Sequence, residues 1–251
     1  KGMTVFCNCD DPEESMFWKY FFLNFEFFSL KKLITTHYEE DKLSYKIEIT
    51  KENIARIPKL DTDGKTIIPD DLKIRLQQNG DFRSSECIDL LKESDIVVTN
   101  PPFSLFREYI AQLIEHNKSF LIIGNMNAIT YKEVFKLIKD NKVWLGCTGP
   151  KAFMQPDKTL KIFGNIAWFT NLTHKKRNEF IPLCVEYTVE KYTKYDNYGA
   201  IEVSKTVEIP KYYEGEMGVP ISFLVKYNPD QFEIVDINPH FFSIVEQGLP
   251  K

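Results

Sequence analysis

The chain has 251 residues, of which 43% are hydrophobic and 14% aromatic, so it can bury a sizeable core, and these values argue against global disorder. Its formal net charge of −4 means that the average field repels phosphate, and a nucleic-acid partner would have to meet a local basic patch. No apolar stretch reaches the roughly 20 residues of a membrane span, so we expect no membrane association.

The cysteines and histidines predict free thiols and no metal site. The five cysteines are odd in number and lie mostly in apolar segments, which is typical of free thiols in a reducing cytoplasm. Cys7 and Cys9 form a C-x-C pair without the second pair of ligands that a structural zinc site needs. The four histidines are scattered and include no HExxH motif, so we predict no bound metal ion.

The sequence opens on a predicted strand followed by a predicted helix. Residues 3–9, MTVFCNC, predict a short buried strand. The segment DDPEE after it predicts a helix start, in which Asp11 is the N-cap, Pro12 holds the first position and two glutamates favour the helix dipole. We expect this helix to run to about Phe28.

Further elements follow in chain order. Residues 31–36 predict a second strand, and we interpret the charged stretch 37–76 as an insertion with one alternating piece, SYKIEIT. A helix capped by Ser84 or Ser85 comes next. The patterns downstream predict strand 95–100, helix 104–117, strand 118–125, helix 130–140, strand 141–146, a long loop 147–161 and strand 163–172.

The alternation of strands and helices from residue 3 to about residue 146 predicts an α/β fold with a parallel sheet and right-handed crossovers. In such sheets, ligands bind at the carboxyl ends of the strands. Three of the predicted strand ends carry unusual polar residues, at positions 8–11, 79–82 and 100–103. We therefore expect the functional site at these three segments.

The most informative motif is Asn100-Pro101-Pro102-Phe103, which directly follows an apolar strand. The two prolines remove two N–H donors, fix two φ angles and keep the preceding residues out of the helical region, so backbone carbonyls can point away from the sheet. Asn100 adds a side-chain carbonyl at the same place, and Phe103 adds a ring. Two fixed acceptors and one aromatic ring form a receptor for an amino group on a flat ring.

Such a receptor can support methyl transfer to an exocyclic amine without a general base. The lone pair of the amine is delocalised into its ring, which makes the nitrogen a poor nucleophile. Hydrogen bonds from the two amino hydrogens to the Asn100 side chain and the Pro101 carbonyl favour a pyramidal nitrogen, which can attack an electrophilic methyl group held in line. The alternative, a plain strand-terminating turn, needs neither the amide nor the ring.

The motif TNPPF resembles the catalytic motif of S-adenosylmethionine-dependent amino-methyltransferases, above all the N6-adenine DNA methyltransferases. Longer strings along nearly the whole chain, among them VFCNCDDPEESMFWKYF and MGVPISFLVKYNPDQFEI, are similar to the EcoRI-type adenine-specific methyltransferases. The resemblance implies an α/β, Rossmann-like class I methyltransferase with a mostly parallel seven-stranded sheet, a terminal antiparallel strand and insertions. It also implies site-specific methylation of adenine N6 in DNA, with the target base flipped out of the duplex and S-adenosylhomocysteine released.

In this family the first strand leads to the methionine end of the cofactor through a Gly-rich turn, which the sequence NCDDPEES lacks. The resemblance implies that Cys9, Asp10, Asp11 and Ser15 form this end of the pocket. Asp10 is the better ligand for the ammonium group, because Asp11 has the alternative role of a helix cap, and Ser15 with nearby N–H groups would bind the carboxylate. Phe17 is assigned to the core.

At the other end of the cofactor, the resemblance implies that Asp81 accepts a hydrogen bond from the adenine amino group and that Phe82 covers the adenine ring. The alternative for this pair is a turn with a core phenylalanine. Asn100 is assigned to the cofactor as well as to the target base. The second strand ends without the acidic residue that usually holds the ribose, and Thr36 is a weak substitute, so ribose recognition stays open.

We predict a catalytic domain of residues 1–172, which includes the insertion 37–76 and the loop 147–161. Residues 173–251 form a small C-terminal extension, which is our candidate for recognising the DNA target. The family has a further element upstream of the first strand that closes the cofactor pocket. Since the sequence begins KGMTVF without an initiator Met, we expect this element to be missing.

The densest basic cluster, Lys175, Lys176 and Arg177, is the candidate for binding DNA phosphates, and a solvated surface segment is the alternative. Phe103 is the expected stacking platform for a flipped base, and Phe153 is a candidate for a second one. We expect double-stranded DNA as partner, a cognate restriction endonuclease as functional partner, a monomer, and a cytoplasmic location in a bacterial or phage system.

Two other functions stay open. The same N-P-P-F pocket could act on an RNA base or on the side-chain amide of a protein glutamine. The absent Gly-rich turn and the missing upstream element would also fit a catalytically silent binding protein.

Overall fold

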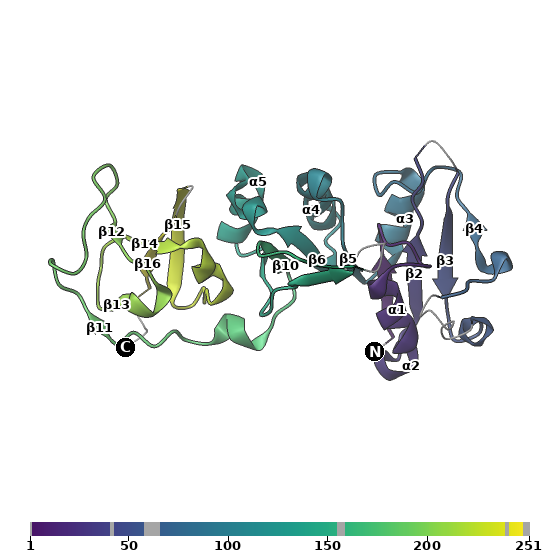
Figure 1. The fold of residues 1–251 in the computed structure, drawn as a ribbon, viewed down its shortest axis with the longest axis horizontal. Helices are drawn as coiled ribbons and strands as arrows, with labels where there is room; N and C mark the ends of the chain where they lie inside the picture. Colours follow the sequence, from purple (N-terminus) through teal and green to yellow (C-terminus); the bar gives the residue numbers. More distant parts are fainter. Residues whose placement is uncertain (1, 41–42, 58–65, 155–158, 239–240, 248–251) are drawn as a thin grey trace. The chain divides into compact units, whose positions relative to one another are not determined.

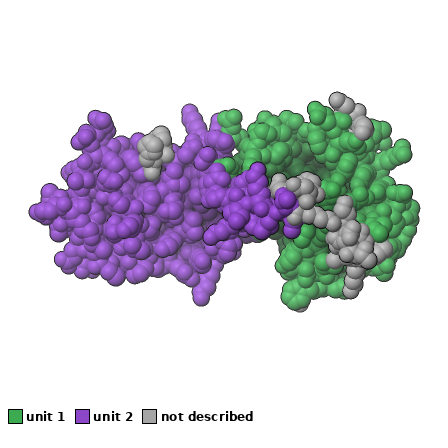
Figure 2. All heavy atoms as spheres, viewed as in Figure 1, with its two compact units in different colours: residues 1–125 green, residues 126–251 purple. Residues whose placement is uncertain are grey.

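The computed structural model describes residues 2–40, 43–57, 66–154, 159–238 and 241–247. The chain divides into two compact units, Lys1–Asn125 and Met126–Lys251, which are coloured separately in Figure 2. None of the helices among the described residues is long and apolar enough to cross a membrane.

The first unit is an α/β structure built on a mixed sheet (Figure 1). Among the described residues of this unit, the strands lie in the order β4-β3-β2-β1-β5-β6. Strands β2, β1, β5 and β6 are parallel neighbours, and β3 and β4 add an antiparallel edge beside β2. The elements are β1 (Thr4–Cys7), α1 (Met16–Leu23), α2 (Phe25–Phe28), β2 (Lys32–Thr36), β3 (Tyr45–Ile49), β4 (Ile74–Arg75), α3 (Ser85–Glu93), β5 (Ile96–Thr99), α4 (Phe106–Glu115) and β6 (Ser119–Asn125).

A parallel core with helices between its strands agrees with the predicted α/β class and is compatible with a Rossmann-like methyltransferase. The predicted count of seven strands is not confirmed. The stretch 37–76 is more than an insertion, because its alternating piece forms β3, which pairs with β2, and β4 extends the same edge. Alternating apolar and polar residues suit an antiparallel edge strand, because one face of the strand packs on the core and the other faces solvent.

The helix after β1 begins later than the sequence predicts. Ser15, and not Asp11, is the N-cap of α1, because its hydroxyl accepts hydrogen bonds from the N–H groups of Phe17 and Trp18. Asp11 instead turns the chain ahead of the helix, where its carboxylate accepts from the Glu13 N–H at 2.8 Å. The predicted single helix to Phe28 is also interrupted, since α1 ends at Leu23 and the short α2 follows it.

The core of the first unit lies between α1, α2 and the strands β1 to β3. Trp18, Phe25, Leu33 and Ile47 are almost completely buried in it, and Phe17 is partly buried against the same cluster, as predicted. Replacing a fully buried aromatic side chain such as Phe25 with alanine typically costs about 3–5 kcal/mol. This packing fixes the carboxyl ends of β1 and β2 relative to each other.

The described residues of the second unit form the α-helix α5, short 3-10 helices and several small sheets (Figure 1). A four-stranded sheet has the order β12-β14-β16-β15, and α5 packs on it through Phe135, whose ring centroid lies 6.0 Å from that of Phe242. The elements are α5 (Lys132–Lys139), β7 (Trp144–Leu145), β8 (Ala152–Met154), β9 (Leu160–Ile162), β10 (Ile166–Thr170), β11 (Val185–Glu186), β12 (Ile201–Glu202), β13 (Pro210–Lys211), β14 (Met217–Pro220), β15 (Phe232–Asn238) and β16 (Phe241–Glu246).

The predicted loop 147–161 is only partly irregular. Within the described residues, β8 and β9 pair antiparallel, and β10 pairs antiparallel with β7. The Gly, Pro and Lys content of this stretch concealed two short strands, whose three residues each give too little periodicity to be recognised.

Candidate active site

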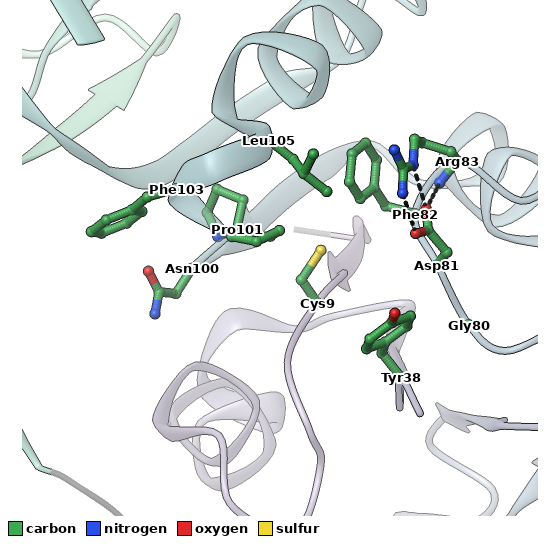
Figure 3. A pocket seen from close by; sticks show the side chains of 11 residues that line it. Cys9, Tyr38, Gly80, Asp81, Phe82, Arg83, Asn100, Pro101, Phe103 and Leu105 are labelled. Atoms are coloured by element: carbon green, nitrogen blue, oxygen red, sulfur yellow. Dashed lines mark hydrogen bonds and ion pairs between the residues drawn. The ribbon is translucent and has the colours of Figure 1, made fainter. Parts of the chain in front are cut away.

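A cavity of about 630 Å³ lies in the first unit at the carboxyl ends of its parallel strands (Figure 3). Cys9 and Tyr38 line it after β1 and β2, and segments 80–83 and 100–103 line it together with Leu105. In Figure 3, Asn100 and Phe103 lie at one end, Asp81, Phe82 and Arg83 lie at the other with Tyr38 beneath them, and Cys9 lies in between. This volume is typical of a site for a small molecule.

The N-P-P-F segment forms the first end of the cavity. The Asn100 side chain is exposed, and so is the ring of Phe103, at 39% of its surface. Pro101 is buried, whereas Pro102 is extended, with φ −61° and ψ 122°, and leads into a short 3-10 turn that begins at Phe103. The structure thus brings the amide and the ring to one open edge, as the motif predicts.

Asp10 lies three residues after the end of β1, and its side chain is buried and hydrogen-bonded within the protein. Its carboxylate accepts from the Ser15 hydroxyl at 2.8 Å and from the Thr99 hydroxyl. Its own carbonyl accepts from the Thr35 hydroxyl at 2.6 Å. Burial raises the pKa of Asp10 to about 6, although hydrogen bonds from the Thr99 and Ser15 hydroxyls oppose that rise.

The other residues predicted at the methionine end of the cofactor divide between the cavity and the protein interior. Cys9 lines the cavity, with a left-handed φ of 66°, a conformation that glycine usually supplies. Burial raises the pKa of its thiol. Asp10, Asp11 and Ser15 are not among the residues that line the cavity. Ser15 caps α1 and Asp11 caps the preceding turn, so both side chains have local partners.

The far end of the cavity is formed by Gly80 to Arg83. The Asp81 carboxylate accepts from the Nε of Arg83 at 2.9 Å and from its Nη2 at 2.7 Å, and these bonds lower the pKa of Asp81. Phe82 is buried edge-on against Tyr109, with ring centroids 4.9 Å apart. Gly80 has a φ of +82°, and a Cβ there would lie 2.0 Å from the His37 carbonyl oxygen, so only glycine fits.

Three residues that line the cavity were missed by the sequence analysis, namely Tyr38, Arg83 and Leu105. Tyr38 follows β2, where a ribose ligand was sought, while the side chain of Thr36 is 1% exposed and bonds to the Asn8 side chain. An aromatic residue two positions after a strand end was the available signal for Tyr38. Arg83 was signalled only by its closeness to Asp81.

The basic segment at 175–177 lies in the second unit and its side chains differ in environment. Lys175 and Lys176 are exposed, and Lys176 donates to the Cys147 carbonyl at 3.3 Å. Arg177 is only 8% exposed, because its guanidinium lies 4.0 Å from the centroid of the Trp144 ring and donates to the side chain of Asn141 at 2.9 Å. These contacts give Arg177 a packing role.

The structure also places Phe153, the candidate second stacking residue, and the cysteines. Phe153 lies on β8, half-buried against Phe163 at a centroid distance of 5.4 Å. Cys147 and Cys184 are exposed, in contrast to the buried Cys7 and Cys87. Within the described residues, no group of three or more His, Cys, Asp or Glu side chains could hold a metal ion.

Comparison with known proteins identifies the family. A family model described as adenine-specific methyltransferase EcoRI matches residues 1–247. The chain belongs to the family of EcoRI-type adenine-specific methyltransferases. Site-specific methylation of adenine in DNA is the activity that goes with this membership.

Individual relatives agree with this assignment. The chain is 48% identical over 254 residues to the Type II methyltransferase M.EcoRI of Escherichia coli, an alignment that covers 92% of this chain and 78% of the relative. It is 40% identical over 260 residues to M.MgeORF184P of Mycoplasma genitalium, covering 94% and 77% of the two chains. It is 38% identical over 264 residues to M.MpnI of Mycoplasma pneumoniae, covering 96% and 77%. Both are also named Type II methyltransferases. No solved structure gave a significant match.

Proposed function

We propose that this protein transfers a methyl group from S-adenosylmethionine to the exocyclic N6 amine of an adenine flipped out of double-stranded DNA. The observation that carries the proposal is the cavity with an exposed amide and ring, Asn100 and Phe103, at one end and Asp81 with Phe82 at the other. A flipped base needs a stacking surface and acceptors for its amino group, and the first end offers both.

The residues present fit S-adenosylmethionine in size and chemistry. The cavity of about 630 Å³ lies in the range of small-molecule sites. Asp81 and Phe82 would hold the adenine moiety, and Tyr38 after β2 would face the ribose. Cys9 and Asn100 would line the methionine end, and for Asp10, Asp11 and Ser15 a direct contact stays a prediction. When bound, the cofactor supplies an electrophilic methyl group.

The chain's own residues would activate the acceptor by position and electrostatics. The side-chain oxygen of Asn100 and the carbonyl of Pro101 would accept from the two amino hydrogens of adenine, which favours a pyramidal nitrogen with a localised lone pair. Phe103 would stack on the base and hold its plane. The prolines keep this carbonyl out of the sheet, and no general base is required.

The larger organisation follows from the same proposal. Residues 1–172 would form a Rossmann-like class I catalytic domain with a seven-stranded sheet and a terminal antiparallel strand, and residues 173–251 would contain the target-recognition region. The exposed Lys175 and Lys176 would contact DNA phosphates, with Arg177 supporting them from below. We infer a monomeric enzyme that protects DNA from a cognate restriction endonuclease.

A parallel methyl-transfer assay tests the proposal. The protein is incubated with methyl-labelled S-adenosylmethionine and, in separate reactions, with duplex DNA, ribosomal RNA and glutamine-containing peptide. We expect label in DNA, in N6-methyladenine. Label confined to peptide or RNA would show that the acceptor is another amide or base, and the absence of cofactor binding in calorimetry would indicate a catalytically silent protein.

A further inference from the structure

Arg83 lines the cavity next to Asp81 and holds the Asp81 carboxylate with three donors (Figure 3). The Arg83 Nε donates to Oδ1 at 2.9 Å, and its Nη2 donates to Oδ2 at 2.7 Å. The backbone N–H of Arg83 also donates to Oδ1, at 2.8 Å. A guanidinium that bonds both oxygens of a carboxylate fixes the orientation of that carboxylate as well as balancing its charge.

The Arg83 guanidinium is itself held from α4. Its Nη1 donates to the Glu108 carboxylate at 3.2 Å, and its Cζ lies 5.4 Å from the centroid of the Phe82 ring. One turn further along α4, the Gln112 side chain donates to the Phe82 carbonyl at 3.2 Å. The carboxylate of Asp81 is therefore oriented by a side chain that a neighbouring helix anchors.

The hydrogen bonds from Arg83 leave the Asp81 carboxylate with one acceptor position. A carboxylate oxygen has two lone pairs, so Oδ1 is fully used by the Nε and the backbone N–H of Arg83. Within the described part of the chain, Oδ2 accepts from Nη2 alone. Because the Asp81 side chain is 20% exposed and lines the cavity, the remaining position on Oδ2 suits a ligand that donates one hydrogen bond.

We propose that Arg83 makes the cavity selective for a 6-aminopurine nucleoside, because it holds Asp81 as an acceptor for the exocyclic amino group of the cofactor's adenine. The inference rests on the proposed function, in which Asp81 and Phe82 hold this adenine. Arg83 acts through Asp81, so it is a positioning residue for cofactor recognition.

The protonation state of Asp81 fits this selectivity. The hydrogen bonds from Arg83 lower the pKa of Asp81, so the carboxylate stays ionised and has no proton to donate. A 6-oxopurine has an oxygen in place of the amino group, and two acceptors that face each other form no hydrogen bond. A site built to accept from an amino group rejects an analogue that lacks it.

An ordinary surface ion pair is the alternative, since the Arg83 side chain is 50% exposed and such pairs contribute little to stability. The first unit contains a pair of that kind, Arg56 with Asp71, in which both side chains are exposed and neither lines the cavity. The pair at the cavity differs from it, because Arg83 bonds both carboxylate oxygens and also a second carboxylate on α4. Arg56 therefore provides a matched control.

Calorimetric Kd values for S-adenosylhomocysteine and S-inosylhomocysteine, which differ in the amino or oxo group at purine position 6, test the inference. We expect wild type to bind the adenosyl compound about 30-fold more tightly, an effect typical of one hydrogen bond to a charged group. In Arg83→Gln we expect this ratio to fall to about threefold, mainly through weaker binding of the adenosyl compound. Arg56→Gln should keep the wild-type ratio.

The ratio of the two affinities separates positioning from a general structural role. A wild-type ratio in Arg83→Gln, or an equal loss of both affinities, would overturn the inference. An unchanged ratio with a lower salt dependence of DNA binding would overturn it in favour of a phosphate contact. Arg83→Lys keeps the positive charge but cannot bond both oxygens in the same way, so we expect it to lose most of the preference. A full wild-type ratio in Arg83→Lys would show that charge alone suffices.

The outcomes also distinguish this inference from the proposed function. If wild type methylates adenine in DNA and Arg83→Gln keeps the ratio, the inference alone fails. If Arg83→Gln loses a preference that wild type shows, but wild type methylates no DNA, the proposed function alone fails. If wild type binds neither compound, both fail.

Discussion

The ends of β5 and β1 lie at the same cavity, but the polar side chains that follow them differ in exposure. After β5, the amide of Asn100 and the ring of Phe103 are exposed. After β1, the carboxylate of Asp10 is buried and bonded inside the protein, and Ser15 caps a helix. Both ends carry residues that could bind a ligand, but Asn100 and Phe103 line the cavity, whereas Asp10 and Ser15 do not.

This difference shows that residue type alone does not tell whether a polar side chain contacts the ligand or holds the surrounding protein structure in place. An exposed amide has unused hydrogen-bonding capacity that a base can take up, whereas a buried carboxylate must be satisfied by the protein itself. We therefore expect substitutions after β5 to change catalysis with little effect on folding. Substitutions after β1 should change stability as well as catalysis.

Asn100→Ala should have the largest effect. It removes an acceptor that acts on the target amine, so we expect the methyl-transfer rate to fall by about 1,000-fold, while the Kd of the cofactor changes only a few-fold. Asn100→Asp keeps an acceptor and should be milder. Single-turnover kinetics with calorimetry would measure both, and an equal loss of rate and affinity would argue against the assigned role.

The pH dependence of stability should show the cost of burying Asp10. Its pKa is raised from 3.8 to about 6, so its contribution to stability is fully present below about pH 4 and is lost as the pH rises through about 6. The loss amounts to roughly 3 kcal/mol at neutral pH. The side chain in Asp10→Asn cannot ionise, so this variant should not lose stability over the same pH range. Denaturant unfolding of both proteins between pH 4 and pH 7.5 would measure the difference.

Three neighbours of Asp10 have pKa values outside that interval. Cys7 and Cys9 on the β1 side and Tyr109 on α4 face it, and burial raises the pKa of each of them further above neutrality. A wild-type protein that gains stability over Asp10→Asn as the pH rises would show that the carboxylate is not buried as described.

Phe103→Ala should weaken the contact with the target base. Stacking of a base on an aromatic side chain is worth about 1–3 kcal/mol, so we expect kcat/KM for DNA to fall about tenfold or more. Because the ring is 39% exposed, the melting temperature should change little. Phe103→Tyr keeps the ring and serves as the control, and a similar loss in both variants would exclude stacking as the cause.

Among these variants, Lys175→Ala should have the smallest effect on DNA binding. It extends the comparison of exposed and buried polar residues to the second unit. An exposed lysine that contacts one phosphate should lower the salt dependence of DNA binding by about one counterion, with unchanged stability. Arg177→Ala should instead destabilise the fold, since it removes the packing on Trp144. Binding titrations at several salt concentrations would separate them, and equal slopes for wild type and Lys175→Ala would contradict a phosphate contact.

The sequence was informative wherever a feature depends on neighbouring residues. The end of β5 and the outward segment at 100–103 follow from two prolines, which act locally. The cap at Ser84 follows in the same way, since its hydroxyl accepts from the N–H of Cys87. These predictions required no knowledge of distant contacts.

Features that depend on distant partners could not be predicted. The left-handed turn at Cys9 is uncommon for a residue other than glycine, so its sequence gives no local signal for it. The burial of Arg177 depends on Trp144 and Asn141, which belong to another segment. The pairing of β3 with β2 was hidden as well, because the alternating pattern of a strand does not specify its neighbour.

The most direct test of the central claim is nucleoside analysis of duplex DNA methylated by the purified protein with methyl-labelled S-adenosylmethionine. We predict that the label elutes as N6-methyladenine and that it is nearly absent when Asn100→Ala replaces the wild type. Label in a methylated cytosine, or full labelling of adenine by Asn100→Ala, would contradict the assignment of the segment Asn100–Phe103 as the centre of adenine methylation.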